Sequence, residues 1–323
     1  MVLFLDYSIA HMFSWASLLV ILGLTLFEVI SSIDNAIINA EVLGGMSQKA
    51  RKWFLFWGIL FAVFVVRGAL PWLIVWATTP ELGPIGALTA TFSNDPSVHE
   101  AIESSAPILL VGGGTFLIFL FFHWLFLETK YFGLPGERFI ARQGVWFYAV
   151  VSCLLMGIVW EALQIDPMLA FGAVVGSTAF FITHGFKQTA EKAEHEMLSG
   201  TNHLSDVSKI LYLEVIDMTF SIDGVLGAFA FTLSVPLILL GNGIGALVVR
   251  YITVSNIERI KKYALLKNGA MYSILALGAI MLAHGFGAHI AEWVSPVVTL
   301  TIIAYFVYRS FKLVRQTATA EMP

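Results

Sequence analysis

The chain has 323 residues, of which 58% are hydrophobic and only 12% charged, and its mean hydropathy is +0.82. Soluble globular domains carry about 25% charged residues, so this composition excludes an ordinary soluble domain. The net charge of −4 is uninformative, because the distribution of charge matters more than its sum in such a chain. The single cysteine, Cys153, excludes a disulfide framework or a thiolate cluster built from this chain.

Apolar runs of about 20 residues recur along the whole chain, and this is the length that an α-helix needs to cross a bilayer. We predict an all-α polytopic membrane protein in which residues 1–323 form a single transmembrane domain. The nine expected spans are 13–41, 53–77, 107–128, 144–162, 167–185, 208–233, 236–254, 269–288 and 293–312. Ser47 is the expected N-cap at the start of the second span.

The basic residues indicate the orientation. All 18 lysines and arginines except Arg67 and Arg250 fall in alternate loops or near the C-terminal end. The segments that hold them are 42–52, 128–143, 186–209, 255–268 and 309–315. Because basic residues mark the cytoplasmic side of membrane proteins, we predict that the N-terminus lies outside and the C-terminus inside.

Two of the expected spans carry a matched pair of carboxyl groups. Aligning the Ser-Ile-Asp of each copy places Glu28 opposite Asp217 and Asp34 opposite Asp223. A charged side chain at the bilayer centre costs roughly 2.5–3.5 kcal/mol, so it persists where it has a partner or a function. The matched spacing favours a cation site over buried polar packing between helices. The two segments are 26–35 (LFEVISSIDN) and 213–224 (LEVIDMTFSIDG).

The two remaining basic residues extend this internal similarity. Arg67 and Arg250 each follow two valines, and each lies nine residues after a glycine, Gly58 or Gly241. Since spans one and six cross in opposite directions, the chain is expected to contain an inverted-topology repeat. The first repeat is 13–162, the second is 208–312, and 163–207 forms a connecting helix and a cytoplasmic linker. Transporters of this kind bind substrate at the repeat interface near the bilayer midplane.

The spacing within each motif limits how one ion can be bound. Six residues of regular helix place Glu28 and Asp34 about 120° and about 9 Å apart, so an unbroken helix cannot bring both to one ion. One solution is a helix break at Ser31–Ser32 and at Thr219–Phe220–Ser221, which would free backbone carbonyls. The other is a crossing of spans one and six that brings Asp34 and Asp223 to the same ion.

The available ligand atoms suit a hard cation. Carboxylate, amide, hydroxyl and carbonyl oxygens are typical ligands of Mn²⁺, Mg²⁺ and Ca²⁺. Neither motif contains cysteine or histidine, so a zinc or copper site of the usual kind is not expected. The two arginines are expected to pair with Glu28 or Asp217 when no metal is bound, with a purely structural ion pair as the alternative. The expected primary ligands are Asp34 and Asp223; the auxiliary ligands or proton carriers are Glu28, Asp217 and Glu214; the neighbouring ligands are Asn35, Ser32 and Ser221; and the charge-compensating residues are Arg67 and Arg250.

The pair of motifs resembles the TerC/Alx family of bacterial integral membrane proteins. That family is named for tellurium resistance, and its members are associated with manganese export. The resemblance covers most of the chain, because the number of spans, the motif positions and the linker before the second motif all fit. This sequence has Gly224 where asparagine or serine is frequent, and its Ile38-Asn39-Ala40-Glu41 continuation is typical of a less characterised subgroup. The resemblance implies a multi-pass protein of the bacterial inner membrane with Mn²⁺ as its substrate.

The first functional hypothesis is therefore a secondary transporter that exports a divalent cation, with Mn²⁺ as the expected ion. The chain has no P-loop, so ATP is not expected to drive transport directly. Protons are the expected coupling ion, because a buried carboxyl can hold a proton when it releases the metal. It has no HExxH or GxSxG motif, and we expect neither enzymatic activity, nor a tightly bound cofactor, nor a nucleic-acid partner. One alternative is a membrane assembly or metallation partner for exported proteins, and another is a Ca²⁺ or other cation–proton exchanger.

Overall fold

The computed structural model describes residues 14–44, 46–58, 61, 67–90, 96–198, 205–255 and 262–320. Every regular element in these ranges is a helix, which confirms the all-α prediction. The elements are α2 (Trp15–Ser31), α3 (Ile33–Gly44), α4 (Gln48–Trp53), the π-helix η1 (Phe54–Gly58), α5 (Arg67–Thr78), the 3₁₀ helix η3 (Pro80–Leu82), α6 (Gly83–Ala90), α7 (Pro96–Leu127), α8 (Glu137–Ala141), the 3₁₀ helix η4 (Gly144–Trp146), α9 (Phe147–Ile165), α10 (Pro167–Leu198), α11 (Asp206–Ala228), α12 (Val235–Ser255), α14 (Leu266–Gly285) and α15 (Val294–Ala320).

Six helices in the described part of the chain are long and apolar enough to cross a membrane. They are Ser104–Leu127, Gly144–Ile165, Pro167–Thr189, Val235–Ile252, Leu266–Gly285 and Val294–Gln316. Six of the nine predicted spans coincide with them, as expected for a multi-pass membrane protein. The other three predicted spans, the orientation and the inverted repeat stay predictions. Residues 13–41 overlap α2 and α3, residues 208–233 overlap α11, and parts of 53–77 lie outside the described residues.

Large apolar side chains cover the outer surface of the bundle. Met156 and Trp160 on α9 and Phe171 and Ile182 on α10 are all exposed. An exposed apolar surface of this extent is unusual for a soluble monomer, whereas lipid tails solvate it well. The outer faces of α9 and α10 therefore have the composition of a lipid-facing surface.

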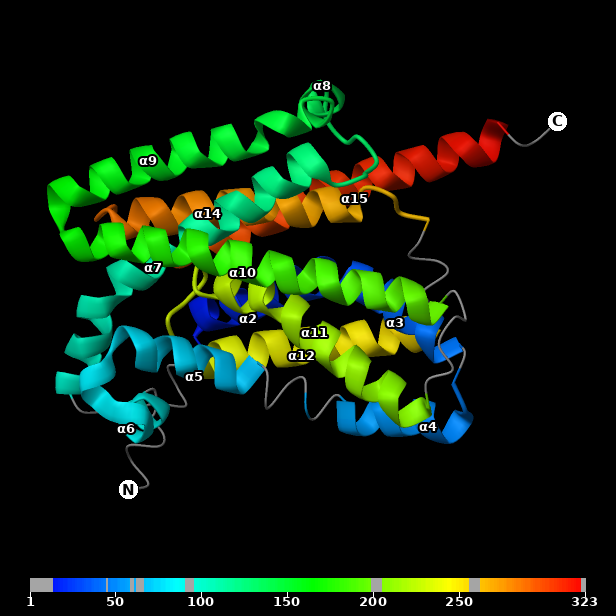
Figure 1. The fold of residues 1–323 in the computed structure, drawn as a ribbon, viewed down its shortest axis with the longest axis horizontal. Helices are drawn as coiled ribbons and strands as arrows, with labels where there is room; N and C mark the ends of the chain where they lie inside the picture. The colour runs from blue at the N-terminus through cyan, green and yellow to red at the C-terminus, as the bar shows by residue number, and fades with distance from the viewer. Residues whose placement is uncertain are drawn as a thin grey trace.

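Helix α7 lies at the centre of the bundle and packs against both α10 and α14 (Figure 1). Glycines allow these close approaches. A Cβ atom on Gly112 would lie 2.9 Å from the carbonyl oxygen of Gly172 in α10, and one on Gly114 would lie 2.9 Å from that of Gly278 in α14. The two glycines are two residues apart, so they face opposite sides of α7. Small residues at helix contacts in membranes let backbones approach in this way.

Two segments are more helical than the sequence suggested. Residues 78–106 were expected to form an outer loop, but α6 lies within them and α7 begins at Pro96, with Pro107 inside the helix. The segment after residue 185 was expected to be a separate linker helix, whereas α10 continues without interruption from Pro167 to Leu198. In both cases the helix continues past the apolar stretch, because hydropathy marks the bilayer boundary and not the end of a helix.

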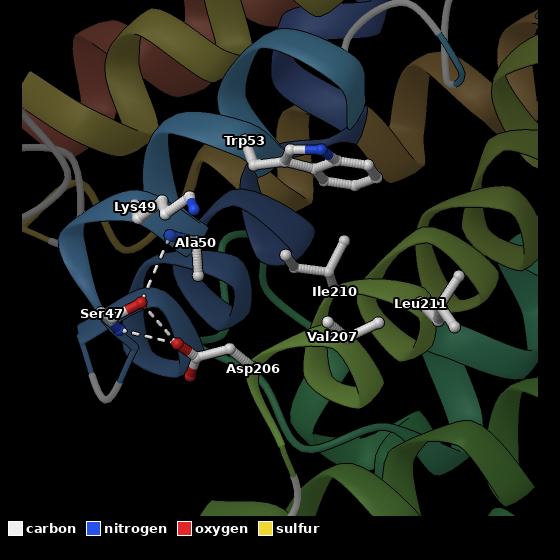
Figure 2. Close-up of a pocket in the computed structure, with 8 residues that line it drawn as sticks. All are labelled: Ser47, Lys49, Ala50, Trp53, Asp206, Val207, Ile210 and Leu211. Atoms are coloured by element: carbon white, nitrogen blue, oxygen red, sulfur yellow. Dashed lines mark hydrogen bonds between the residues drawn. The ribbon is translucent and has the colours of Figure 1, made fainter.

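Serine residues begin several helices, and one of them also connects α4 to α11. The Ser47 hydroxyl accepts a hydrogen bond from the backbone N–H of Ala50 at 3.3 Å, which confirms it as an N-cap. The Ser47 hydroxyl and backbone N–H also donate to Asp206 Oδ2, at 2.5 and 3.3 Å (Figure 2). A pocket of about 270 Å³ beside this contact is lined mainly by apolar side chains, including Trp53 and Leu211. The contact fixes the start of α11 to the start of α4.

Candidate functional site

Glu28 is a buried carboxylate near the end of α2, and only 2% of its surface is exposed. The Ser32 hydroxyl donates a hydrogen bond to Glu28 Oε1 at 2.9 Å. The other oxygen, Oε2, faces α11, where a Cβ atom on Gly224 would lie 2.9 Å away. Glu28 belongs to the first motif and Gly224 directly follows Asp223 of the second. The two motifs, which are almost 200 residues apart in the chain, therefore meet at this carboxylate.

Helix α12 holds the other side of Glu28. A Cβ atom on Gly245 would lie 2.6 Å from Glu28 Cβ and 2.7 Å from Cγ. One turn earlier, the Thr25 hydroxyl donates to the carbonyl oxygen of Gly241 at 3.1 Å. Gly241 and Gly245 thus let α12 approach the backbone of α2, and the stem of Glu28 lies across Gly245. Sequence reasoning missed this role, although the Gly241-x-x-x-Gly245 spacing is a known pattern of close helix packing in membranes.

The predicted helix break is present in one motif and absent from the other. Helix α2 ends at Ser31, Ser32 has φ −91° and ψ 4°, and α3 begins at Ile33. The interruption is local, because Ser32 still donates its N–H to the Glu28 carbonyl and accepts from the N–H of Ala36, both at 3.0 Å. The Ser31 hydroxyl also donates to the Glu28 carbonyl, at 3.3 Å, so side-chain hydrogen bonding accompanies the irregular turn.

In the second motif the predicted break at Thr219–Phe220–Ser221 is wrong. Helix α11 runs unbroken from Asp206 to Ala228. The break was one of two arrangements considered from the six-residue spacing of the carboxyl groups, and the other was a crossing of spans one and six. The observed helix has 23 residues, or about 35 Å at 1.5 Å per residue, and this length needs only a modest tilt.

The remaining predicted ligands divide into two groups. Ser221 is buried and Asp223 is half-buried on α11. The charges of Lys187 and Glu128 act on Asp223, so these residues from α10 and the end of α7 are part of its surroundings. The side chains of Asp34, Asn35, Asp217 and Arg67 lie outside the described residues, and the shared site of Asp34 and Asp223 stays a prediction. Among the described residues, no group of three or more His, Cys, Asp or Glu is arranged to hold a metal ion.

Arg250 and Glu214 form a buried ion pair between α12 and α11. Arg250 Nη2 lies 3.5 Å from Glu214 Oε1, and the guanidinium carbon lies 4.0 Å above the ring of Phe54. Gly58 provides the space, because a Cβ atom there would overlap Glu214 Oε1 and lie 3.2 Å from Arg250 Nη1. The expected partners of Arg250 were Glu28 and Asp217, and the side chain of Asp217 lies outside the described residues. The pair observed here is with Glu214, which was expected to be an auxiliary ligand.

Asn242 is a further polar residue in this region that sequence reasoning did not single out. It is fully buried in α12, and both polar atoms of its side chain have no hydrogen-bond partner among the described residues. It lies three residues before Gly245 and therefore on the same side of α12 as the contact with Glu28. An unpaired buried amide is costly, so it needs an explanation such as an ion or water. Amide oxygens are common ligands of hard cations.

Comparison with known proteins places the chain in a family. A family model described as "Protein of unknown function (DUF475)" matches residues 33–317, which is most of the chain. The chain belongs to the DUF475 family. The region that matches the DUF475 model contains Asp34, the whole second motif and the Glu214–Arg250 pair, whereas Glu28 precedes it. No curated protein and no solved structure matches this DUF475 chain. The resemblance to the TerC/Alx family stays a prediction.

Proposed function

We propose that this protein is a secondary transporter that exports a divalent metal cation from the cytoplasm, with Mn²⁺ as the expected ion. The observation that carries this proposal is the contact between Glu28 and Gly224, because it brings a buried carboxylate of the first motif against the residue that follows Asp223 in the second. A carboxylate buried at membrane depth without a function would be costly. Two carboxylates from matched motifs supply the negative charge that a divalent ion needs.

The ligand atoms around this contact support a hard cation. Glu28 offers a carboxylate whose Oε1 accepts from Ser32, and Ser221, Asp223 and Asn242 add hydroxyl, carboxylate and amide oxygens from α11 and α12. All of these are oxygen ligands, which favour Mn²⁺, Mg²⁺ or Ca²⁺ over softer ions. Asp34 and Asn35 complete the proposed site, with Asp217 as a proton carrier.

We assign Arg250 the role of compensating charge at Glu214. The pair is buried, and its net charge is zero, so Glu214 adds no repulsion to an empty carboxylate site. This assignment changes the role of Glu214 from auxiliary ligand to partner of an arginine. Arg67 has the corresponding role in the first half of the chain, in keeping with the proposed inverted repeat of nine spans with the N-terminus outside. In this proposal the protein lies in the bacterial inner membrane.

Proton exchange is the proposed driving reaction. A buried carboxylate that loses a metal ion can take up a proton and so avoid an uncompensated charge in the membrane. Export of one divalent ion against protons would then use the carboxylates of Glu28, Asp34, Asp217 and Asp223 alternately for metal and proton.

The deciding experiment is ion flux in liposomes that contain the purified protein, measured separately for Mn²⁺, Mg²⁺, Ca²⁺ and Zn²⁺. We expect Mn²⁺ flux, and we expect Asp34→Asn and Asp223→Asn each to abolish it, because an amide keeps the shape but removes the charge. Glu161→Gln on α9 is the matched control, because Glu161 is an exposed carboxyl away from both motifs.

The same assay separates the other hypotheses. Flux of Ca²⁺ but not Mn²⁺ would indicate a Ca²⁺–proton exchanger. Absence of flux for every ion in correctly inserted wild-type protein would overturn the transport proposal and favour an assembly or metallation partner. Full flux in the double variant Asp34→Asn plus Asp223→Asn would rule out the proposed site while leaving transport intact.

A further inference from the structure

Two histidines from different helices lie in contact inside the bundle. His123 is near the end of α7 and His184 is on α10, and their ring centroids are 3.9 Å apart with an angle of 53° between the planes. His123 is buried, with 7% of its surface exposed, and His184 is half-buried. Neither residue belongs to the carboxylate motifs.

Polar partners extend the pair on both sides. His123 Nδ1 lies 3.6 Å from Glu128 Oε1, and Lys267 Nζ at the start of α14 lies 2.7 Å from Glu128 Oε2. On the other side, His184 Nε2 is 3.0 Å from Nε2 of Gln188, whose side chain is exposed. The chain of contacts therefore runs from Lys267 through Glu128 and both histidines to the surface of α10.

Aromatic rings enclose the histidines. Phe147 packs edge-on against His123 with ring centroids 5.5 Å apart, and Phe180 stacks on His184 at 5.8 Å. These apolar neighbours exclude water from the sides of the pair. Within the described residues, the polar contacts of the histidine pair are then those with Glu128 and Gln188.

The charges around the pair favour a single added proton. Two imidazolium rings in contact would repel each other strongly in a low-dielectric interior, so the second proton is disfavoured. Burial would raise the pKa of Glu128, but its contact with His123 and the charges of Lys267 and Lys187 together lower it well below its usual range. Glu128 is thus ionised, and its negative charge faces His123 Nδ1 at 3.6 Å. The charged groups that act on the cluster are Glu128 and Lys130 after α7, Lys187 on α10, Lys267 on α14 and Asp223 on α11.

We propose that His123 and His184 form a proton-carrying pair that exchanges protons between the cytoplasmic solvent and the carboxylate site. The proposal rests on the transport function proposed above. Glu128, Lys187 and Lys267 surround the pair, and each belongs to a segment that is predicted to be cytoplasmic. Helix α11, which carries Asp223, packs against both α7 and α10, and Glu128 also acts on Asp223. When metal binds from the cytoplasm, a proton leaves a carboxylate and one neutral imidazole accepts it, giving a single imidazolium. Transfer through His184 to water beside Gln188 restores the neutral pair.

The first test is a histidine NMR titration of the full protein in lipid nanodiscs over about pH 5 to 8. Resonances of the two residues are assigned with His123→Gln and His184→Gln. We expect the pair to take up one proton in this range, and replacing either histidine to raise the titration midpoint of the other by about one pH unit. Glu128→Gln should lower the pH at which His123 is half protonated. This variant tests the pair if His123→Gln fails to fold. The proposed pair would be overturned if the titration midpoint of each histidine stayed unchanged when the other was replaced. It would also be overturned if both imidazole rings stayed neutral over the whole pH range.

The second test measures Mn²⁺ flux and internal pH in liposomes. His184→Gln should reduce proton movement coupled to Mn²⁺ roughly tenfold or more, while Mn²⁺ binding to the purified protein stays unchanged. His289→Gln is the matched control, because His289 is exposed near the start of α15. Wild-type flux with unchanged proton coupling in His184→Gln would overturn the carrier role alone. Absence of flux in the wild type would instead overturn the transport function and with it the carrier role, while the titration would still decide whether the two histidines share one proton.

Discussion

Glu28 shows how one buried carboxylate can depend on residues that have no side chain of their own. Gly224 and Gly245 leave space for it on α11 and α12, and Ser32 binds one of its oxygens. A methyl group at either glycine would fall within 3 Å of the Glu28 side chain. The position of the carboxylate therefore depends on the size of its neighbours as much as on its hydrogen bond.

Gly224→Ala should reduce metal flux strongly, because the new Cβ atom would lie 2.9 Å from Glu28 Oε2 and would displace that oxygen. Folding should be retained, since the contact is with the end of a side chain that can shift. Flux and metal binding in purified protein are the measurements. Gly157→Ala on α9 is the matched control, because a Cβ there meets no atom within 4 Å. Wild-type binding in Gly224→Ala would contradict the assigned position of the Glu28 carboxylate.

The Asn242→Leu variant tests whether Asn242 is a metal ligand or only a packing residue. If the buried amide has no ligand, replacing it with an apolar group of similar size should be neutral or stabilising and leave flux unchanged. We expect the thermal stability of the apoprotein to be kept or raised and metal flux to fall. Melting temperature in detergent and flux in liposomes, measured on the same preparation, test this. A stable variant with full flux would remove Asn242 from the proposed site.

At the scale of helices, α11 links the two halves of the site. Its start is tied to α4 through Asp206 and Ser47, Glu214 pairs with Arg250 of α12, and Gly224 contacts Glu28 of α2. The contact between Asp206 and the Ser47 hydroxyl lowers the pKa of Asp206, since a hydrogen bond to the ionised form favours it. Each of these contacts is with a different element, so α11 is held at its start, at Glu214 and near its end.

Arg250→Leu should destabilise the protein by about 3–5 kcal/mol, because it leaves the Glu214 carboxylate buried beside an apolar group. Adding Glu214→Gln should recover part of that loss by removing the uncompensated charge. Chemical or thermal unfolding in detergent, analysed as a double-mutant cycle, measures the coupling between the two residues. Strictly additive effects would show that the pair contributes no coupling energy.

For the whole molecule, the decisive property is the side on which each loop lies. Figure 1 shows the ends of α3, α10 and α15 and the starts of α4 and α11 at the same end of the bundle. From the alternate-loop distribution of lysine and arginine, we predict that this end of the bundle faces the cytoplasm.

Cysteine labelling tests the orientation. With Cys153 replaced by alanine, cysteines introduced in 42–52 and 255–268 should react only from the cytoplasmic side, and those in 85–100 only from outside. Impermeant thiol reagents on intact and opened cells give the measurement. Labelling of 85–100 from the cytoplasm would contradict both the orientation and the inverted repeat.

The amino-acid sequence by itself determined the class of the protein and the local events along its helices. The all-α class, six of the spans, the Ser47 cap and the irregular turn at Ser31–Ser32 follow from hydropathy over about 20 residues or from hydrogen bonds within one helical turn. Such properties depend on residues that are neighbours in the chain, so they can be recognised without knowing the fold.

The tertiary structure decided which helix faces meet. The placing of Glu28 between Gly224 and Gly245, the pairing of Arg250 with Glu214 and the contact of His123 with His184 each join residues that are far apart in the chain. Motif alignment matched Glu28 with Asp217, and the six-residue spacing allowed a break in α11 that the structure does not contain. The partner of Arg250 and the neighbours of Glu28 lie on other helices, so the alignment of the motifs did not reveal them. Contacts between helices depend on rotation and close approach, which small residues such as Gly245 allow but which no single helix specifies.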